Sequence, residues 1–267
     1  MTAKAVKGTY VYCVIADSRA PTRGHLPKGL PGSGPPRLLE LAAGGRTRSP
    51  AARRWLVVAD VPLARYGEAA IKDGLSDLDW VSRAAVAHEA VVESFIASAG
   101  LLPMKLFTIF KNDERAVEYI REQGRRIDAA FARVLKHEEW GLRLMLGARQ
   151  ATDARRGSVR RVSGERSGAT YLARKKAQRD AAVELVGHAR EVAAELYDLL
   201  ARRSKLATRR SLAAAAGTML LDAVFLVPRS RAASFRAAAL RRARALEREG
   251  YLISLTGPWP PYSFVQD

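Results

Sequence analysis

The sequence predicts an α+β protein with two domains. Short runs of β-branched and aromatic residues alternate with stretches in which apolar residues recur at helical spacing, a mixture typical of helices packed against sheets. The 267 residues are enough for two domains of ordinary size. The charged run at 136–139 separates two halves that each carry strands and helices. We therefore expect an N-terminal domain at 1–136 and a C-terminal domain at 137–267.

Three strands are predicted in the first half. Residues 9–16 and 55–62 are dense in β-branched and aromatic residues, and 101–110 is a short apolar run. Residues 17–50 are rich in proline, glycine and arginine. Because proline and glycine at that density oppose both helix and strand, we expect an irregular insertion there.

Two helices complete the first half. One is expected at 78–98 with Gly100 as its C-cap, and the other from the N-cap Asn112 to about Lys136. The order β–insert–β–α–β–α predicts an α+β sandwich with its helices on one face of the sheet. The apolar residues that define the first helix are Leu78, Val81, Ala85, Val92, Phe95 and Ile96.

The second half is predicted to be a ferredoxin-like βαββαβ unit. Its long helix has an apolar side formed by Val183, Val186, Ala193, Leu196 and Leu200. A basic loop at 147–167 precedes that helix, and Gly250 is the expected C-cap of the following one. The expected elements are strands at 140–146, 212–216, 218–227 and 251–255, and helices at 168–203 and 230–249.

The net positive charge of the chain favours acidic partners but does not indicate which kind. The chain has 45 Lys and Arg against 27 Asp and Glu, for a formal net charge of +18. Nucleic acid, an anionic membrane and an acidic protein surface all fit such a balance. Arginine dominates over lysine and alanine is very frequent, as coding bias alone would produce, so the charge carries little weight by itself.

The single cysteine and the N-terminus limit the cellular setting. Cys13 lies in an apolar strand, which predicts a buried thiol and excludes an internal disulfide or a multi-cysteine zinc site. The first residues lack an apolar signal core, and no stretch is long enough to span a bilayer. We expect a cytoplasmic protein.

The stretch 256–264, Thr-Gly-Pro-Trp-Pro-Pro-Tyr-Ser-Phe, is the most distinctive part of the sequence. Gly257 and Pro258 are expected to end the preceding strand. Trp259, Tyr262 and Phe264 carry rings that are costly to leave in water, so this stretch is predicted to dock on a surface. Two interpretations stay open: it covers the core of its own domain, which we favour, or it contacts another protein.

No constellation in the sequence supports catalysis. His88, Glu89 and Glu93 lack the second histidine, four residues after the first, that a zinc-protease helix needs. A structural role, such as a hydrogen bond between the helix and a neighbouring strand, is the favoured interpretation of His88. The remaining histidines are scattered and no nucleophile elbow is present. We predict no enzymatic activity, no cofactor and no metal.

Nucleic-acid binding is the alternative function. A four-stranded ferredoxin-like sheet is the framework of the RNA-recognition domain, which stacks bases on exposed aromatic rings. The strands of the second half carry few such rings, and the basic and aromatic signature of that domain is absent. The arginine-rich helix that begins near Arg229 could meet phosphates or be a solvated face.

Several motifs together resemble the GvpL/GvpF family of gas vesicle accessory proteins over nearly the whole chain. They are the strand start Tyr10-Val-Tyr12, the loop at 26–30, His88-Glu89-Ala-Val-Val-Glu93 with the stretch 102–108, the stretch 167–175, and the stretch 256–264. The last two are the most specific, since few families end a strand in Gly-Pro-Trp-Pro-Pro.

The resemblance implies a non-enzymatic protein required for gas vesicle assembly. It implies a modified ferredoxin-like N-terminal domain, a second α/β domain with long helices, and contacts with the hydrophobic shell protein and other accessory proteins. It also implies a location in the cytoplasm and at the vesicle, where such a protein can be a minor component. The expected interaction residues are Trp259, Tyr262, Phe264, Tyr171 and Arg174. The last two share a helix face, and we expect them to contact the other domain or the C-terminal stretch.

Overall fold

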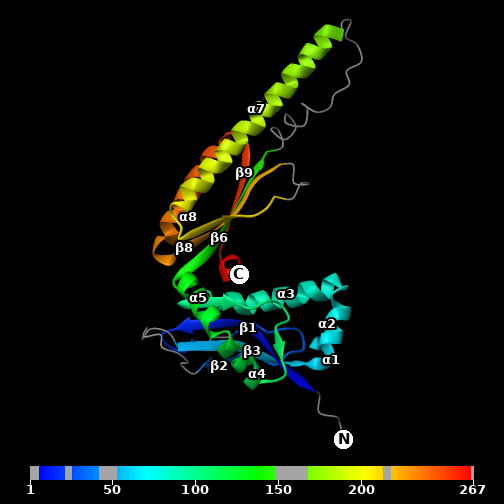
Figure 1. Cartoon of the computed structure of the whole chain (residues 1–267), viewed down its shortest axis with the longest axis vertical. Helices are drawn as coiled ribbons and strands as arrows, with labels where there is room; N and C mark the ends of the chain where they lie inside the picture. Colours follow the sequence, from blue (N-terminus) through cyan, green and yellow to red (C-terminus); the bar gives the residue numbers. More distant parts are fainter. Residues whose placement is uncertain (1–5, 22–25, 42–52, 148–167, 213–217, 266–267) are drawn as a thin grey trace. The chain divides into compact units, whose positions relative to one another are not determined.

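The computed structural model describes residues 6–21, 26–41, 53–147, 168–212 and 218–265 (Figure 1). It is an α+β protein with two antiparallel sheets, as the sequence predicts. The chain divides into two compact units. The first unit comprises Met1–Glu138 together with Trp259–Asp267, and the second comprises Glu139–Pro258.

The first sheet is built around the central strand β1, which is buried from Gly8 to Ala16. The strand order is β2-β3-β1-β4, and β5 also pairs with β1. Strand β1 pairs antiparallel with β3, β4 and β5, and β2 pairs antiparallel with β3. The strands are β1 (Lys7–Asp17), β2 (Arg37–Leu41), β3 (Arg53–Pro62), β4 (Gly100–Pro103) and β5 (Ile109–Phe110).

Helices cover both faces of this sheet, so the expectation that they lie on one face is wrong. Trp55 and Val57 of β3 pack in the same core as Val91 of α3. Arg54, which alternates with them and therefore points to the opposite face, pairs with Asp128 of α5 at 2.6 Å. The helices of the first unit are α1 (Leu63–Tyr66), α2 (Glu68–Gly74), α3 (Leu78–Glu93), α4 (Asp113–Glu122), α5 (Gly124–Val134) and α9 (Tyr262–Val265).

The proline-rich insertion is ordered where it is described. Leu30 is buried, and its backbone N–H donates to the Tyr12 hydroxyl at 3.0 Å. The Tyr66 hydroxyl donates to the Pro31 carbonyl at 2.8 Å. The prediction of wholly irregular structure at 17–50 is wrong for β2, because residues 37–41 pair antiparallel with β3 and Leu38 packs against the core. Residues 22–25 and 42–50 lie outside the described residues.

Three predicted elements of the first unit are interrupted. Helix α3 ends at Glu93, and Gly100 is not its C-cap but the first residue of β4, where an added Cβ would lie 2.9 Å from the Phe131 ring. The predicted strand 101–110 is broken because Phe107, with a positive φ of 63°, leaves the sheet and stacks on Trp80. Asn112 is the N-cap as predicted, but the helix that follows divides at Gln123 into α4 and α5.

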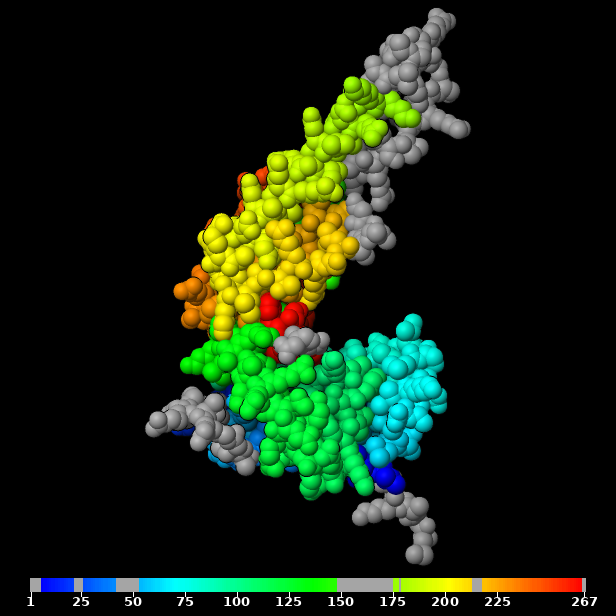
Figure 2. Space-filling view, viewed as in Figure 1, coloured from blue at the N-terminus to red at the C-terminus, as the bar shows by residue number. Residues whose placement is uncertain are grey.

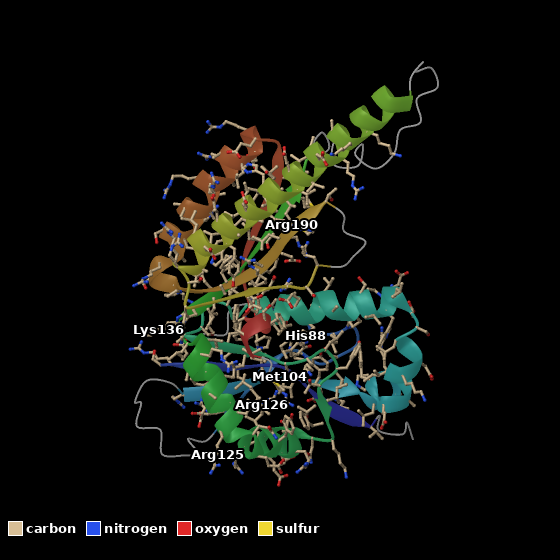
Figure 3. The ribbon with its side chains drawn as sticks, turned by 45° about the horizontal axis from the view of Figure 1, so that its top comes forward. His88, Met104, Arg125, Arg126, Lys136 and Arg190 are labelled. Atoms are coloured by element: carbon tan, nitrogen blue, oxygen red, sulfur yellow. The ribbon has the colours of Figure 1, made fainter. Side chains whose placement is uncertain are left out.

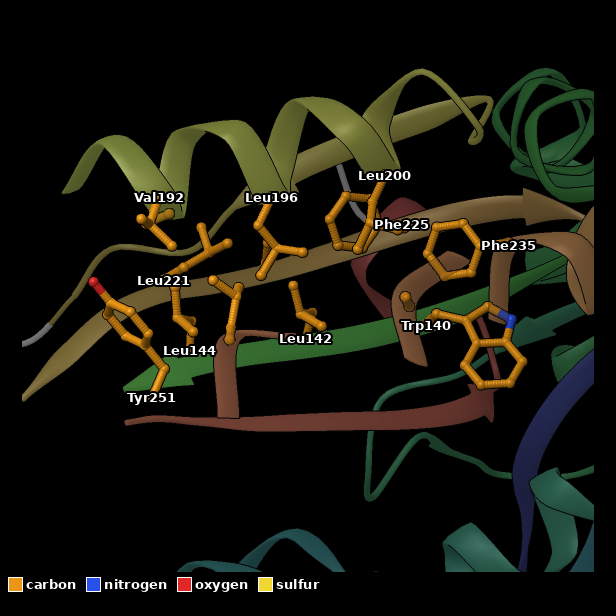
Figure 4. Close-up of a cluster of buried hydrophobic side chains, with 14 of the residues drawn as sticks. Trp140, Leu142, Leu144, Val192, Leu196, Leu200, Leu221, Phe225, Phe235 and Tyr251 are labelled. Carbon is orange, nitrogen blue, oxygen red and sulfur yellow. The ribbon is translucent and has the colours of Figure 1, made fainter. Parts of the chain in front are cut away.

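The second sheet has the order β7-β8-β6-β9, and helices α7 and α8 pack on its apolar face (Figure 4). Alternate residues of β6, from Trp140 to Leu146, point into this core, where Leu196 and Leu200 of α7 meet them. The elements are β6 (His137–Leu146), α7 (Gly168–Ala201), β7 (Leu206–Arg209), β8 (Met219–Pro228), the 3₁₀ turn η1 (Arg229–Arg231), α8 (Ala232–Arg248) and β9 (Tyr251–Trp259).

Two strands of the second unit differ from prediction. The strand before β8 is β7 rather than residues 212–216, of which 213–216 lie outside the described residues. Strand β9 continues through Gly257 and Pro258 to Trp259, because an edge strand tolerates a proline that donates no hydrogen bond. Position 257 requires glycine for two reasons: its φ is +126°, which other residues rarely adopt, and an added Cβ would lie 2.9 Å from the Glu139 carbonyl oxygen.

The apolar side of α7 is shorter than predicted. Ala193, Leu196 and Leu200 are buried, whereas Val183 is exposed. The core begins only at Ala189, and the N-terminal half of α7 extends past the sheet (Figure 1). The strand order reported for both sheets is compatible with a ferredoxin-like description, which stays a prediction.

Candidate functional site

The C-terminal segment, Trp259–Val265, is the site that the sequence singles out, and it belongs to the first unit. Its helix α9 packs on α5 and β4. Phe264 is only 4% exposed, whereas Trp259 is 41% exposed. In the space-filling view, red atoms from the end of the chain reach the surface (Figure 2). The segment thus has a buried part and an open part.

Two hydrogen bonds attach this segment to helices of the first unit. The Tyr262 hydroxyl donates to Oε2 of Glu89 on α3 at 2.6 Å, and Arg133 of α5 donates to the Phe264 carbonyl at 3.0 Å. Burial, followed by the bond to Glu89, raises the pKa of Tyr262. Burial also raises the pKa of Glu89, and the bond from Tyr262 offsets part of that rise. Burying the Glu89 carboxylate would cost more free energy if the Tyr262 hydroxyl did not donate a hydrogen bond to it.

Beneath the segment lies a buried polar link between α3 and β1. The Tyr10 hydroxyl and Nδ1 of His88 are 2.7 Å apart, and the Phe107 N–H donates to the same hydroxyl at 3.3 Å. The hydroxyl therefore has its own proton to donate to Nδ1. Burial lowers the pKa of His88 to about 4, and the nearby Met104 backbone offsets part of that shift. Figure 3 shows His88 and Met104 within the first unit. The prediction of a structural helix-to-strand bond for His88 is confirmed.

Aromatic rings extend this link across the first core. Tyr10 and Tyr12 meet edge to face at 4.7 Å between ring centroids, and Tyr12 stacks on His88 at 5.6 Å. A bulge in β1 between Val11 and Cys13 lets both tyrosines and Cys13 face the same core. Burial holds the pKa of the Cys13 thiol well above its ordinary value, so the thiol is an inert core group.

Large apolar side chains stay exposed on the same unit. Leu78 of α3 is 80% exposed and Val86 is 68% exposed. Leu78 is one of the apolar residues whose spacing predicts this helix, yet its side chain faces solvent, and Val86 was not among the residues so identified. The signal for Val86 was available: with His88 and Val92 inward, a helical spacing of 100° per residue turns Val86 outward.

Comparison with known proteins decides the identity. A family model described as gas vesicle synthesis protein GvpL/GvpF matches residues 8–266. The chain belongs to the GvpL/GvpF family. The resemblance found in the sequence motifs is thereby confirmed. Gas vesicle protein L of Streptomyces sp. (strain CB03234) is 30% identical over 268 residues, which cover 96% of this chain and 92% of that protein.

Two solved structures of GvpF proteins share the fold. The crystal structure of GvpF from Anabaena sp. PCC7120 aligns with a TM-score of 0.66 and 15% identity, covering 98% of this chain and 99% of that chain. The crystal structure of GvpF from Microcystis aeruginosa aligns with a TM-score of 0.64 and 14% identity, covering 97% and 99%. At these identities the likeness concerns the fold.

The remaining predicted site residues of this GvpL/GvpF protein are not brought together by the described contacts. Tyr171 and Arg174 lie in α7 of the second unit, and their side chains are outside the described residues. Within the described residues no group of three or more His, Cys, Asp or Glu side chains is arranged to bind a metal ion. The search of the same residues for a helix long and apolar enough to cross a bilayer found none.

Proposed function

We propose that this GvpL/GvpF protein acts in gas vesicle assembly by binding the hydrophobic shell subunit through apolar side chains on its first unit. The observation that carries the proposal is the exposure of Trp259 and Val86 on two elements that the Tyr262–Glu89 hydrogen bond ties together.

The connection between these side chains follows from spacing. Val86 lies three residues before Glu89 on α3, and Trp259 lies three residues before Tyr262. The 2.6 Å bond between Glu89 and Tyr262 joins the helix that carries Val86 to the segment that carries Trp259, and we infer that the two exposed side chains face one region of the surface. Leu78, two turns before Val86, extends this region along α3. We call Leu78, Val86 and Trp259 the apolar surface.

An apolar surface suits a partner that assembles through its own apolar side chains. Contiguous exposed apolar residues on a water-soluble fold mark interaction sites, and tryptophan is enriched among the residues that dominate binding energy. A shell subunit that polymerises needs a protein that shields its apolar face or delivers it to the growing wall. The apolar surface would cover part of that face.

The two interpretations of the C-terminal segment then apply to different residues. Phe264 and Tyr262 are inner anchors, supported by the burial of Phe264 and the bond to Glu89. Trp259 is the outward contact. Tyr171 and Arg174 of α7 stay part of the proposal as interaction residues.

Three further statements are part of the proposal. The protein works without catalysis, in line with its family and with a buried His88 already committed to Tyr10. It works in the cytoplasm and at the gas vesicle, with the shell protein and other accessory proteins as partners. Both units derive from a ferredoxin-like framework, which the strand orders β2-β3-β1-β4 and β7-β8-β6-β9 support.

Co-purification with the gas vesicle shell subunit tests the proposal. The variant Val86→Ser/Trp259→Ala should fold like the parent by circular dichroism and retain little of the shell subunit. The matched control Leu212→Ser/Leu252→Ser removes two exposed apolar side chains from the second unit and should bind as the parent does. Equal binding by the Val86/Trp259 variant and the parent would overturn the assignment of this surface.

A further inference from the structure

We propose that the exposed face of α8 in the second unit binds an acidic, leucine-bearing segment of a partner protein. This inference is independent of the apolar surface on the first unit. It rests on the charge of the helix, on the lack of ion pairs for Arg236, Arg241 and Arg244 among the described residues, and on one apolar side chain among the arginines.

Helix α8 buries one side and presents arginines on the other. Phe235, Ala239 and Leu246 are buried in the second core. Arg241, Arg244 and Arg248 follow one another at spacings of three and four residues, so they form one row along the opposite side. Nitrogen-tipped side chains line the outer side of this helix in Figure 3.

The charge on this face is not neutralised within the described part of the chain. Arg236, Arg241 and Arg244 make no ion pair there, whereas Arg242 on the flank reaches Glu195 of α7 at 3.5 Å. Glu247 is the one acidic residue in the sequence of α8. Guanidinium groups in a row suit carboxylates, which accept their paired N–H donors with defined geometry.

The apolar content of the face favours an acidic protein over nucleic acid. Leu240 is 38% exposed and lies on the helix surface between Arg236 and Arg244, next to Ala237. A small apolar centre bordered by arginines resembles the core and rim of a protein interface. Single-stranded nucleic acid would need aromatic rings for stacking, and α8 has none on its exposed face.

The packing of α8 also disfavours a DNA duplex. The helix lies against the sheet along its length and beside α7, so its flank is occupied. A helix that enters a major groove about 12 Å wide needs a protruding face, and the contact with α7 narrows the open side of α8. A partner helix or extended segment with glutamates around a leucine can instead lie across the open row of arginines.

The test uses the full-length protein and three probes: a synthetic helical peptide of leucines and glutamates, polyglutamate, and duplex DNA. Arg241→Glu/Arg244→Glu should weaken binding of the peptide by about tenfold or more, with a steep dependence on salt. Leu240→Ser should weaken binding of the peptide several-fold and leave that of polyglutamate unchanged. The control Arg121→Glu/Arg125→Glu changes the net charge equally on exposed helices of the first unit.

Three results would overturn the inference. Equal weakening by the control would mean that net charge alone attracts the peptide. Tighter binding of DNA than of the peptide, with no effect of Leu240→Ser, would identify a nucleic-acid face. No measurable binding of the peptide at low salt would exclude an acidic partner. None of these outcomes bears on binding of the shell subunit.

Discussion

Protonation of His88 is expected to destabilise the first unit as the pH falls. Burial lowers the pKa of His88 from 6.5 to about 4 in the folded protein. Between these values the unfolded chain binds more protons than the folded one, so the free energy of unfolding decreases as the pH drops. The contribution is fully present above pH 6.5 and is lost by about pH 4, and its size is about 3 kcal/mol.

Two other groups of the first unit also have shifted pKa values, and their effects on stability must be distinguished from that of His88. Glu89 has a raised pKa, so its protonation favours the folded state as the pH falls and opposes the effect of His88. Asp113 has a pKa lowered mainly by Arg37, and it acts in the same sense as His88 at lower pH. The variant His88→Gln keeps an amide able to accept from the Tyr10 hydroxyl but cannot become charged. Comparing it with the parent isolates the histidine.

Native-state hydrogen exchange of β1 amides reports the opening of the first unit separately from the second. We expect the parent to lose about 3 kcal/mol more protection than His88→Gln between about pH 7 and pH 4. Urea denaturation followed by tryptophan fluorescence provides a second measure. If the parent and His88→Gln lose the same protection, the reasoning about His88 is refuted.

Three other substitutions test packing, charge and backbone. Phe264→Ala should lower the stability of the first unit by about 3 kcal/mol because it empties a buried position, whereas Trp259→Ala should cost less because that ring is 41% exposed. Equal losses in thermal denaturation would contradict the docking. Arg37→Gln should cost about 1–2 kcal/mol by breaking the paired contacts to Asp113, and a double-mutant cycle with Asp113→Asn should show coupling between the two residues. Gly257→Ala should destabilise the second unit by more than about 1 kcal/mol, because φ is positive there and the Glu139 carbonyl leaves no room, and an unchanged melting temperature would count against this.

Local sequence signals were sufficient where a segment interacts with its own neighbours. The density of β-branched and aromatic residues predicted β1, and the N-cap Asn112 predicted the start of α4. The ring content of the stretch 256–264 predicted docking, and its motif predicted the family. In each case the decisive chemistry lies within a few residues.

Long-range contacts explain most of the differences. The break in the strand 101–110 depends on Phe107 stacking on Trp80, which no local pattern reveals. The docking of the C-terminal segment on the first unit depends on Glu89 and Arg133, which are far from it in sequence. Val183 has the right spacing for the core but is exposed, since the core contacts of α7 begin only at Ala189. Helical periodicity predicts which face of the helix a side chain lies on, but not whether a strand or another helix packs against that face.

The return of the C-terminal segment to the first unit has a consequence for biosynthesis. A ribosome completes residues up to Glu138 and must then translate all of Glu139–Pro258 before Trp259–Val265 appears. At ordinary rates of synthesis this interval is on the order of ten seconds. During that time the partly buried carboxyl of Glu89 lacks its donor Tyr262, and the surfaces of α5 and β4 that receive Phe264 are uncovered. The first half of the nascent chain therefore stays incompletely covered until synthesis is almost finished, although it is made first.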